Sequence, residues 1–183
     1  ESVKQPLSYS RVTKILSSVG GKITIPTTSS YIEYCEDAWL LLRLHNINAA
    51  FAERETNSKY YFIDNGLLSL LLTDPTTTLL ENIVAVSLFR KYGNSNDGER
   101  VFFYKQNVEV DFYIPDDELA IQVSYSIEES DMTEKREVEA LKKLPKALSC
   151  KRRLIITYDE EKTIEDEYGV IEVIPCWKWL ISR

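Results

Sequence analysis

The sequence predicts an α/β (α+β) fold, in which a unit of two helices and a hairpin precedes a mixed β-sheet with helices on its faces. Apolar residues recur with helical spacing before residue 45, and apolar and polar residues alternate in several later segments. The 183 residues, 44% of them apolar, are enough to bury a substantial core. The longest apolar stretch, residues 66–72, is far below the roughly 20 residues of a membrane-spanning helix, so we expect no membrane span.

Two amphipathic helices are expected first. Residues 8–19 place apolar side chains at positions i, i+3, i+4 and i+7, with Ser8 as the N-cap and Gly20 and Gly21 as the stop. A second helix is expected over residues 26–44, opened by a proline. The stripes expected to be buried are Val12, Ile15, Leu16 and Val19 in the first helix and Tyr31, Cys35, Ala38, Trp39 and Leu42 in the second.

Two strands, residues 47–52 and 59–63, are expected next, around a polar turn. Two helices followed by a hairpin make up the last part of a winged helix-turn-helix, so residues 1–65 are predicted to form a winged-helix-like domain. A DNA-reading helix carries Arg, Lys, Asn or Gln near its N-terminus, whereas residues 27–33 are Thr, Ser, Tyr, Ile and Glu. We therefore favour a structural or protein-contacting unit, and a winged-helix DNA-binding protein remains an alternative.

The second predicted domain covers residues 66–183. A short helix over residues 67–72 leads into elements in the order αβββαββα, which predicts a mixed sheet with flanking helices. The expected helices are 79–92, 132–144 and one starting at Pro175, and the expected strands are 101–105, 108–114, 119–125, 154–158 and 170–174.

Composition excludes several kinds of site. The six glycines form no phosphate-binding loop, so we expect this chain to bind no nucleotide and no other cofactor. The only histidine, His45, is expected to be a half-exposed loop residue, and the three cysteines, Cys35, Cys150 and Cys176, lack a C-x-x-C spacing. Too few ligands remain for a zinc site, and the unpaired thiols indicate a reducing, cytoplasmic location.

The charge distribution bears on possible partners. The net charge is −7; residues 1–65 are balanced, with seven basic and seven acidic residues, and residues 66–183 carry 15 basic and 22 acidic residues. Neither part has the basic surface that phosphate contacts require, so nucleic acid is not an expected partner, although it is left open. Because the sequence starts at Glu1 and its one methionine is Met132, we expect a segment of a longer protein.

A polar face is predicted on the hairpin of residues 108–125. Pairing the apolar faces of its two arms sets Ile114 opposite Leu119, Phe112 opposite Ile121 and Val110 opposite Val123. The other face then brings Asp111 opposite Gln122 and Glu109 opposite Ser124. Glu81 leads the apolar stripe of the preceding helix, so its carboxylate is expected to point toward the sheet, where it requires a partner.

Several stretches resemble the C-terminal region of a large family of bacterial and archaeal ATP-binding proteins. They are residues 60–67 (YYFIDNGL), 80–82 (LEN), 109–112 (EVDF), 121–123 (IQV) and 136–141 (REVEAL). In that family an AAA-type ATPase module is followed by a winged helix and by domain of unknown function 4143, which is similar to the PD-(D/E)XK nuclease fold. The ending VIPCWKWL resembles Bacteroides-type members.

The resemblance implies that residues 66–183 are PD-(D/E)XK nuclease-like and assigns a role to four residues. Glu81 would be the helix acid, Asp111 the main metal ligand, Gln122 the residue at the (D/E) position and Ser124 the residue at the lysine position. Such nucleases use carboxylates to hold Mg²⁺ and a lysine to offset charge on the phosphate. Gln122 and Ser124 depart from that pattern, and Lys105 is expected to lie on the wrong face to compensate.

The favoured hypothesis is a non-catalytic C-terminal module of an AAA-type ATPase, serving partner contact or regulation. Its partners would be the parent's own N-terminal ATPase module, which would hold ATP and Mg²⁺, and possibly another protein. The alternatives are a metal-dependent DNA or RNA endonuclease using Glu81, Asp111 and Gln122, and the DNA-binding protein above. We expect a vestigial motif with no bound metal, in which Glu81 and Asp111 share the polar groups of Ser124 and Gln122.

Overall fold

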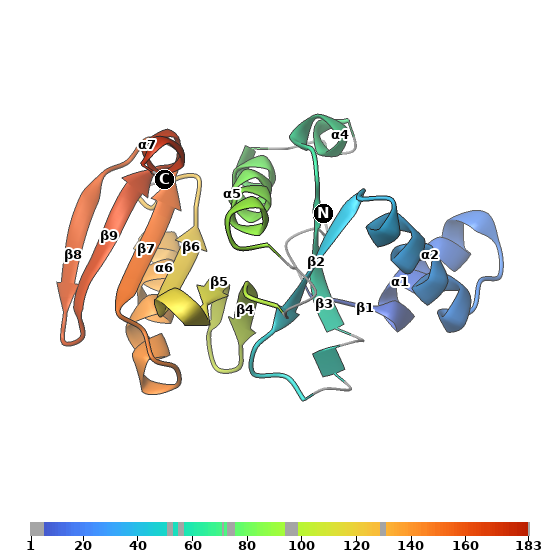
Figure 1. Ribbon diagram of the computed structural model, residues 1–183, viewed down its shortest axis with the longest axis horizontal. Coiled ribbons are helices and arrows are strands. Elements are labelled where there is room, and N and C mark those ends of the chain that lie inside the picture. Colours follow the sequence, from blue (N-terminus) through green and yellow to red (C-terminus); the bar gives the residue numbers. More distant parts are fainter. Residues whose placement is uncertain are drawn as a thin grey trace.

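The computed structural model describes residues 6–50, 53–54, 57–70, 72, 76–93, 99–128 and 131–182, with only the backbone of residues 131–135. In this part of the chain, strands form one sheet in the order β1-β3-β2-β4-β5-β6-β7-β9-β8. Helices α1 and α2 lie at one end, near β2 and β3, and the strands β7, β9 and β8 lie at the other (Figure 1). No helix in the described ranges is long and apolar enough to cross a membrane.

The first helix is confirmed, but its apolar stripe is not buried. Helix α1 (Tyr9–Gly20) follows strand β1 (Leu7–Ser8), and the Ser8 hydroxyl caps it by accepting from the Arg11 amide. Ile15 is 48% exposed and Val19 is 87% exposed, so the prediction that this stripe packs into a core is wrong. The helix contacts α2 and β1 on its other sides and leaves these side chains uncovered.

The second helix is shorter than predicted. Helix α2 (Ile25–Asp37) ends well before residue 44, and Trp39 then adopts a left-handed backbone with φ of 57°. Trp39 is 71% exposed, so its predicted place in a buried stripe is wrong. Helical spacing alone could not locate this end, because leucines continue at residues 40–42 in a segment that is extended.

The hairpin is formed by β2 (Leu41–Asn46) and β3 (Asn57–Phe62), which pair antiparallel with Leu41 opposite Phe62 and Leu44 opposite Lys59. The predicted first strand over residues 47–52 is therefore wrong. Residues 47–49 form a turn, and residues 51–52 lie outside the described ranges. His45 belongs to β2 and is only 9% exposed, which corrects its expected position in a half-exposed loop.

The hairpin does not stand apart from the rest of the sheet. Strand β2 pairs in parallel with β4 (Phe102–Lys105) through His45 and Asn46. Two helices lie between β3 and β4 in sequence. Helix α4 (Asn65–Ser69) begins after the cap residue Asp64, and helix α5 (Thr76–Tyr92) packs against the sheet near β3 and β6. One hydrogen-bonded sheet thus joins the two segments of the chain.

The second segment follows the predicted order with one addition. After β4 come β5 (Glu109–Ile114), the 3₁₀ turn η1 (Pro115–Asp117), β6 (Leu119–Val123), α6 (Asp131–Lys143) and the 3₁₀ turn η2 (Leu144–Lys146). The last elements are β7 (Arg152–Thr157), β8 (Lys162–Asp166), β9 (Gly169–Pro175) and α7 (Cys176–Ile181). Strand β8 was not predicted. The order is therefore αβββαβββα rather than αβββαββα.

Two apolar cores lie on opposite faces of the sheet. One joins α5 and α7 to residues such as Phe112 and Ile121, and the other joins α6 to residues such as Tyr113 and Ala120. Because Tyr113 and Ala120 are neighbours of Phe112 and Ile121 along their strands, the alternation places them on opposite faces. None of the three cysteines, all of which lie in the described ranges, forms a disulfide.

Candidate functional site

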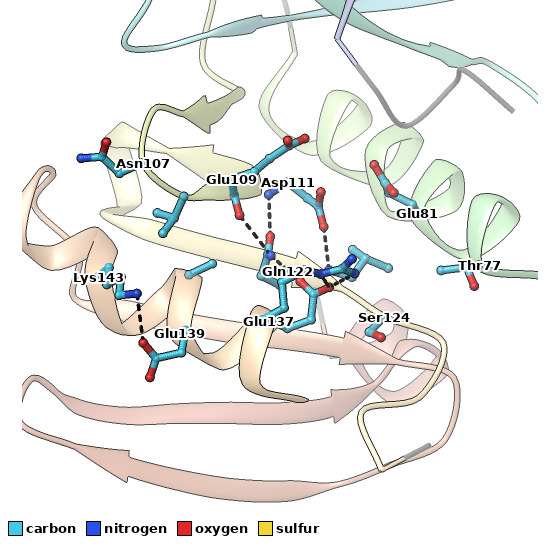
Figure 2. Close-up of a pocket in the computed structure, with 14 residues that line it drawn as sticks. Thr77, Glu81, Asn107, Glu109, Asp111, Gln122, Ser124, Glu137, Glu139 and Lys143 are labelled. Atoms are coloured by element: carbon cyan, nitrogen blue, oxygen red, sulfur yellow. Dashed lines mark hydrogen bonds and ion pairs between the residues drawn. The ribbon is translucent and has the colours of Figure 1, made fainter. Parts of the chain in front are cut away.

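A cavity of about 510 Å³ brings together the four residues that the nuclease pattern singled out. Glu81 comes from α5, Asp111 from β5, and Gln122 and Ser124 from β6 and the residue after it. Figure 2 shows Gln122 between the strand β5 residues Glu109 and Asp111 on one side and Glu137 of α6 on the other. The predicted register is confirmed for Phe112 opposite Ile121 and Ile114 opposite Leu119.

Beyond the pair of Phe112 and Ile121, hydrogen bonds made by side chains link β5 to β6. The amide of Asp111 donates to Gln122 Oε1 at 2.7 Å, and the amide of Val123 donates to Asp111 Oδ2 at 3.0 Å. Val110 is not paired with Val123 as expected; on the other edge of β5 it pairs with Tyr104 of β4, next to a register shift. Asp111 and Gln122 both line the cavity, and both are hydrogen-bonded into the sheet rather than directed to solvent; Asp111 contacts Lys59 of β3, whereas Gln122 contacts Glu137 of α6.

The orientation of the Gln122 amide is fixed by groups of known polarity. Its oxygen accepts from the backbone amide of Asp111, while its nitrogen donates to the Glu109 carbonyl at 3.2 Å and to Glu137 Oε2 at 2.5 Å. A backbone N–H can only donate and a carbonyl can only accept, so the reverse orientation would lose both bonds. The amide oxygen is thus already used by the protein.

Glu137 is a buried carboxylate with two partners. Its side chain is 5% exposed, and Oε1 accepts from Arg136, whose guanidinium reaches the surface. Burial and the nearby carboxylate of Asp111 raise the pKa of Glu137, and its bonds to Arg136 and Gln122 only partly counter this. Sequence reasoning did not select Glu137, although it lies in the REVEAL stretch of residues 136–141.

A lysine that sequence reasoning missed lies among the carboxylates. The Lys59 side chain is 1% exposed, and its ammonium lies 3.0 Å from Asp111 Oδ1, 3.0 Å from Glu109 Oε1 and 3.9 Å from Glu81 Oε1. It also lies 5.4 Å from the centre of the Phe103 ring. A buried charge needs such partners, and strand β3 provides the ammonium from outside the β5–β6 hairpin.

The surroundings of Lys59 and Glu109 favour the charged form of each of these two side chains. Burial alone would lower the pKa of Lys59, but Asp111, Glu81 and Glu109 outweigh it and raise that pKa above its usual range. Burial likewise favours neutral Glu109, but Lys59 and Lys105 outweigh it and lower the pKa of Glu109. Lys105 contacts Glu109 at 2.6 Å from a half-exposed position, and so supports the cluster from its rim.

Glu81 is hydrogen-bonded to a residue of the β2–β3 hairpin. Its Oε1 accepts from the Tyr61 hydroxyl at 2.9 Å, and the Tyr61 ring lies 5.5 Å from that of Phe112. Burial and the charge of Glu81 keep the pKa of Tyr61 well above its usual value, so the phenol stays a donor. The expected inward direction of Glu81 is confirmed, since the residue is 3% exposed.

The prediction that Glu81 and Asp111 share the hydroxyl of Ser124 is wrong. Its Oγ donates to the carbonyl of Ser126 at 2.8 Å, which orders the loop after β6. The lysine position of the nuclease pattern is therefore occupied by a loop-forming residue. The nearest cation to Asp111 among the described residues comes from β3 instead.

The donor set does not fit Mg²⁺. Both oxygens of Asp111 accept hydrogen bonds, Gln122 Oε1 accepts another, and an ammonium already lies among the carboxylates. No three His, Cys, Asp or Glu residues within the described ranges are placed to hold a metal ion. Mg²⁺ gives up its hydration shell reluctantly and would have to displace Lys59 to reach these oxygens.

Comparison with known proteins places the chain in a family. Residues 76–179 match the model described as domain of unknown function DUF4143, and residues 1–78 match the one described as domain of unknown function DUF8612. The chain belongs to the DUF4143 family. It is 32% identical to an uncharacterized protein of Methanocaldococcus jannaschii, MJ1544, over 96% of this chain and 41% of that relative. No solved structure matches the chain.

The DUF4143 match contains Glu81, Asp111, Gln122, Ser124 and Glu137 but not Lys59, which lies in the DUF8612 match. One sequence signal could have found this lysine. Residues two apart on a strand share a face, so Lys59 must face the same way as Tyr61, in a strand that enters the YYFIDNGL stretch. The chain spans 41% of the length of its curated relative, so the activity of a whole protein is a separate question.

Proposed function

We propose that this chain is a non-catalytic module of an AAA-type ATPase, in which a degenerate nuclease-like domain contacts a partner or relays the nucleotide state. The quoted stretches that resemble the C-terminal region of such ATPases support this assignment. The family match to DUF4143 agrees with the domain part of that resemblance. More than half of the length of the M. jannaschii relative lies outside the match, which leaves room there for a further module.

The observation that carries the non-catalytic part is the ammonium of Lys59 among the three carboxylates. In this position it balances charge that a metal ion would otherwise balance. The amide of Gln122 is used within the sheet, and Ser124 orders a loop. Each polar group therefore has a structural use, as expected of a site retained for the fold and for contacts.

A cleavage assay tests this proposal. The chain is incubated with supercoiled plasmid and with single-stranded RNA in Mg²⁺ or Mn²⁺, beside Asp111→Ala and Lys59→Met variants. We expect wild type and both variants to leave the substrates equally intact. Cleavage by the wild type that Asp111→Ala abolishes would overturn the non-catalytic assignment. Calorimetry with ATP should show no binding, because the sequence has no phosphate-binding loop.

A metal-dependent endonuclease is the second candidate; it requires the Lys59 ammonium to move off the carboxylates when Mg²⁺ binds, and the presence of a lysine beside Asp111 is the observation that favours it. The absence of a lysine at Ser124 argued most strongly against nuclease activity, and Lys59 brings an ammonium within 3.0 Å of Asp111 from another strand. In this case Lys59 would offset charge on the scissile phosphate. The same assay distinguishes the two, because Lys59→Met should then lower cleavage by about 10²-fold or more.

A further inference from the structure

A second cavity, of about 590 Å³, lies between strand β2 and the C-terminal half of helix α5. Its apolar lining includes Leu42, Val86 and Phe89, which belong to the main core and reach this cavity at the core's edge. Cavities of about 300–1,000 Å³ with an apolar lining and a few polar groups are typical of small-molecule sites. None of these residues belongs to the site around Asp111.

Trp39 lines this cavity in a costly conformation. Its backbone is left-handed, with φ of 57°, and its side chain is 71% exposed. A bulky residue rarely adopts that conformation, and a large exposed aromatic ring gains little from packing. The conformation closes helix α2, because the Trp39 amide donates to the Glu36 carbonyl at 2.9 Å and the Leu40 amide donates to the Cys35 carbonyl at 2.8 Å. An exposed ring beside an apolar cavity is suited to contact another flat ring.

Some polar atoms of the cavity have ion-pair or hydrogen-bond partners, and others have none among the described residues. Arg43 pairs with Glu36, and His45 Nδ1 lies against the carboxylate of Glu99. Because Nδ1 faces a carboxylate, it carries a hydrogen, and Nε2 is the atom left for a further partner. His45 is 9% exposed, and its Nε2 is buried without a hydrogen-bond partner in the described residues.

Arg90, on the last turn of α5, is a further polar residue of this cavity. It lines the cavity and makes no ion pair with any residue that the structure describes. A guanidinium is suited to bind a carboxylate with two parallel hydrogen bonds. The cavity thus combines an apolar lining, an exposed ring, an exposed arginine without an ion pair among the described residues, and one buried ring nitrogen without a partner there.

We propose that the cavity between β2 and α5 binds a small planar aromatic carboxylate. The ring lies between Trp39 and Phe89, the carboxylate pairs with Arg90, and His45 Nε2 makes the second polar contact. Each lining feature has a counterpart in such a molecule. This site is independent of the proposed function, because it shares no residue with the cluster around Lys59.

Ligand-observed saturation-transfer NMR with 2-naphthoate tests this proposal, with the neutral isostere 2-naphthamide as the comparison. We expect 2-naphthoate to bind with a Kd at or below about 1 mM and 2-naphthamide to bind at least about 10-fold more weakly, because one charge-assisted bond is lost. Arg90→Gln should produce the same loss for 2-naphthoate, whereas Arg11→Gln, at an exposed position on α1, should leave its affinity unchanged.

Trp39→Gly supplies an independent variant that is expected to fold, because glycine adopts a positive φ without strain. It should weaken 2-naphthoate binding by about 10-fold while leaving the unfolding temperature no lower, since the ring is mostly exposed. Three results would each overturn the proposal: no saturation transfer to 2-naphthoate, equal affinity for the acid and the amide, or equal losses in Arg90→Gln and Arg11→Gln.

Discussion

Lys59 and the carboxylates around it form a group in which each member depends on the others. Glu81 and Asp111 are directed inward from α5 and β5, and the ammonium from β3 is the positive charge shared between them. Removing one partner of a buried ion pair leaves an uncompensated charge, which costs far more than an exposed pair ever contributes. Two substitutions test this dependence.

Lys59→Met keeps the length of the side chain and removes its charge. At pH 7 we expect the free energy of unfolding to fall by about 3–5 kcal/mol. The folded-state pKa of Lys59 is raised, so its contribution is complete below its unfolded pKa and constant between about pH 5 and 9. The deficit should therefore shrink under acid conditions, where the carboxylates become protonated, and above the unfolded pKa of lysine, where the contribution of Lys59 declines.

Urea unfolding of Lys59→Met at pH 7 and pH 4 measures that deficit. Lys105→Met is the matched control, because Lys105 contacts the same Glu109 from a half-exposed position. Its loss should stay below about 1 kcal/mol. Equal losses in the two variants would show that Lys59 has no special place in the cluster.

Gln122→Glu restores the acid of the nuclease pattern but removes the amide donor. The new oxygen would face the Glu109 carbonyl and the Glu137 carboxylate, which now accept from Gln122 Nε2. We expect a loss of about 2–4 kcal/mol at pH 7, smaller at pH 5 because burial raises the pKa of Glu137 and a proton can be shared. Thermal unfolding measures it, and Gln106→Glu, at an exposed position, should change little.

At the scale of elements, the sequence was informative where periodicity and burial agree. Helix α5 and the β5–β6 hairpin could be predicted because Phe112, Ile114, Leu119 and Ile121 alternate cleanly and pair across the turn. Strand β2 could not, because its leucines extend the apolar pattern of α2 and only the backbone of Trp39 ends the helix. Strand β8 is a partly exposed edge strand without an apolar run, so no local pattern marked it.

Strand β8 is joined to the sheet by a buried ion pair that the sequence did not reveal. Arg153 of β7 donates to both oxygens of Asp166 at 2.6 and 2.7 Å, and the two side chains are 2% and 6% exposed. The hydrogen bonds from Arg153 lower the pKa of Asp166. A lowered carboxyl pKa contributes stability above the unfolded pKa that is lost as pH falls through the folded value.

Asp166→Asn should therefore lower the free energy of unfolding by about 3–5 kcal/mol at pH 7, because it leaves the Arg153 charge buried without its partner. The difference from wild type should shrink as pH falls below the unfolded pKa of about 4 toward the lowered folded pKa of Asp166. Chemical unfolding across this range provides the measurement. The neighbouring exposed Glu165→Gln should change stability by less than about 0.5 kcal/mol, and a similar loss there would contradict the account.

At the scale of the whole molecule, the site could be predicted only in part. Glu81, Asp111 and Gln122 were selected from helix spacing, strand alternation and the family resemblance, although alternation does not hold through β5, where Val110 and Phe112 lie in different cores. Lys59 reaches the same cluster from β3, and no local rule states which strand lies beside another when they are far apart in sequence. Glu137 was missed for the same reason, since the packing of α6 against β5 and β6 is a long-range contact.

The continuous sheet and the shared cluster make the two segments interdependent. A fragment of residues 66–183 would lack Lys59 and Tyr61 and would leave Glu81 without two of its partners. We expect it to unfold without a cooperative transition or at least about 3 kcal/mol less stably than the whole chain, which should unfold in one step. Differential scanning calorimetry of both provides the test, and two separate transitions in the whole chain would contradict this expectation.

We propose that Lys59 serves as the internal cation of this site, so that no divalent ion binds there. Anomalous diffraction from crystals soaked in Mn²⁺ tests it most directly. We predict no anomalous peak near Asp111 and Glu81, with the Lys59 ammonium still within hydrogen-bonding distance of Asp111. A strong peak within about 2.0–2.4 Å of the Asp111 and Glu81 oxygens, with Lys59 displaced, would contradict the account.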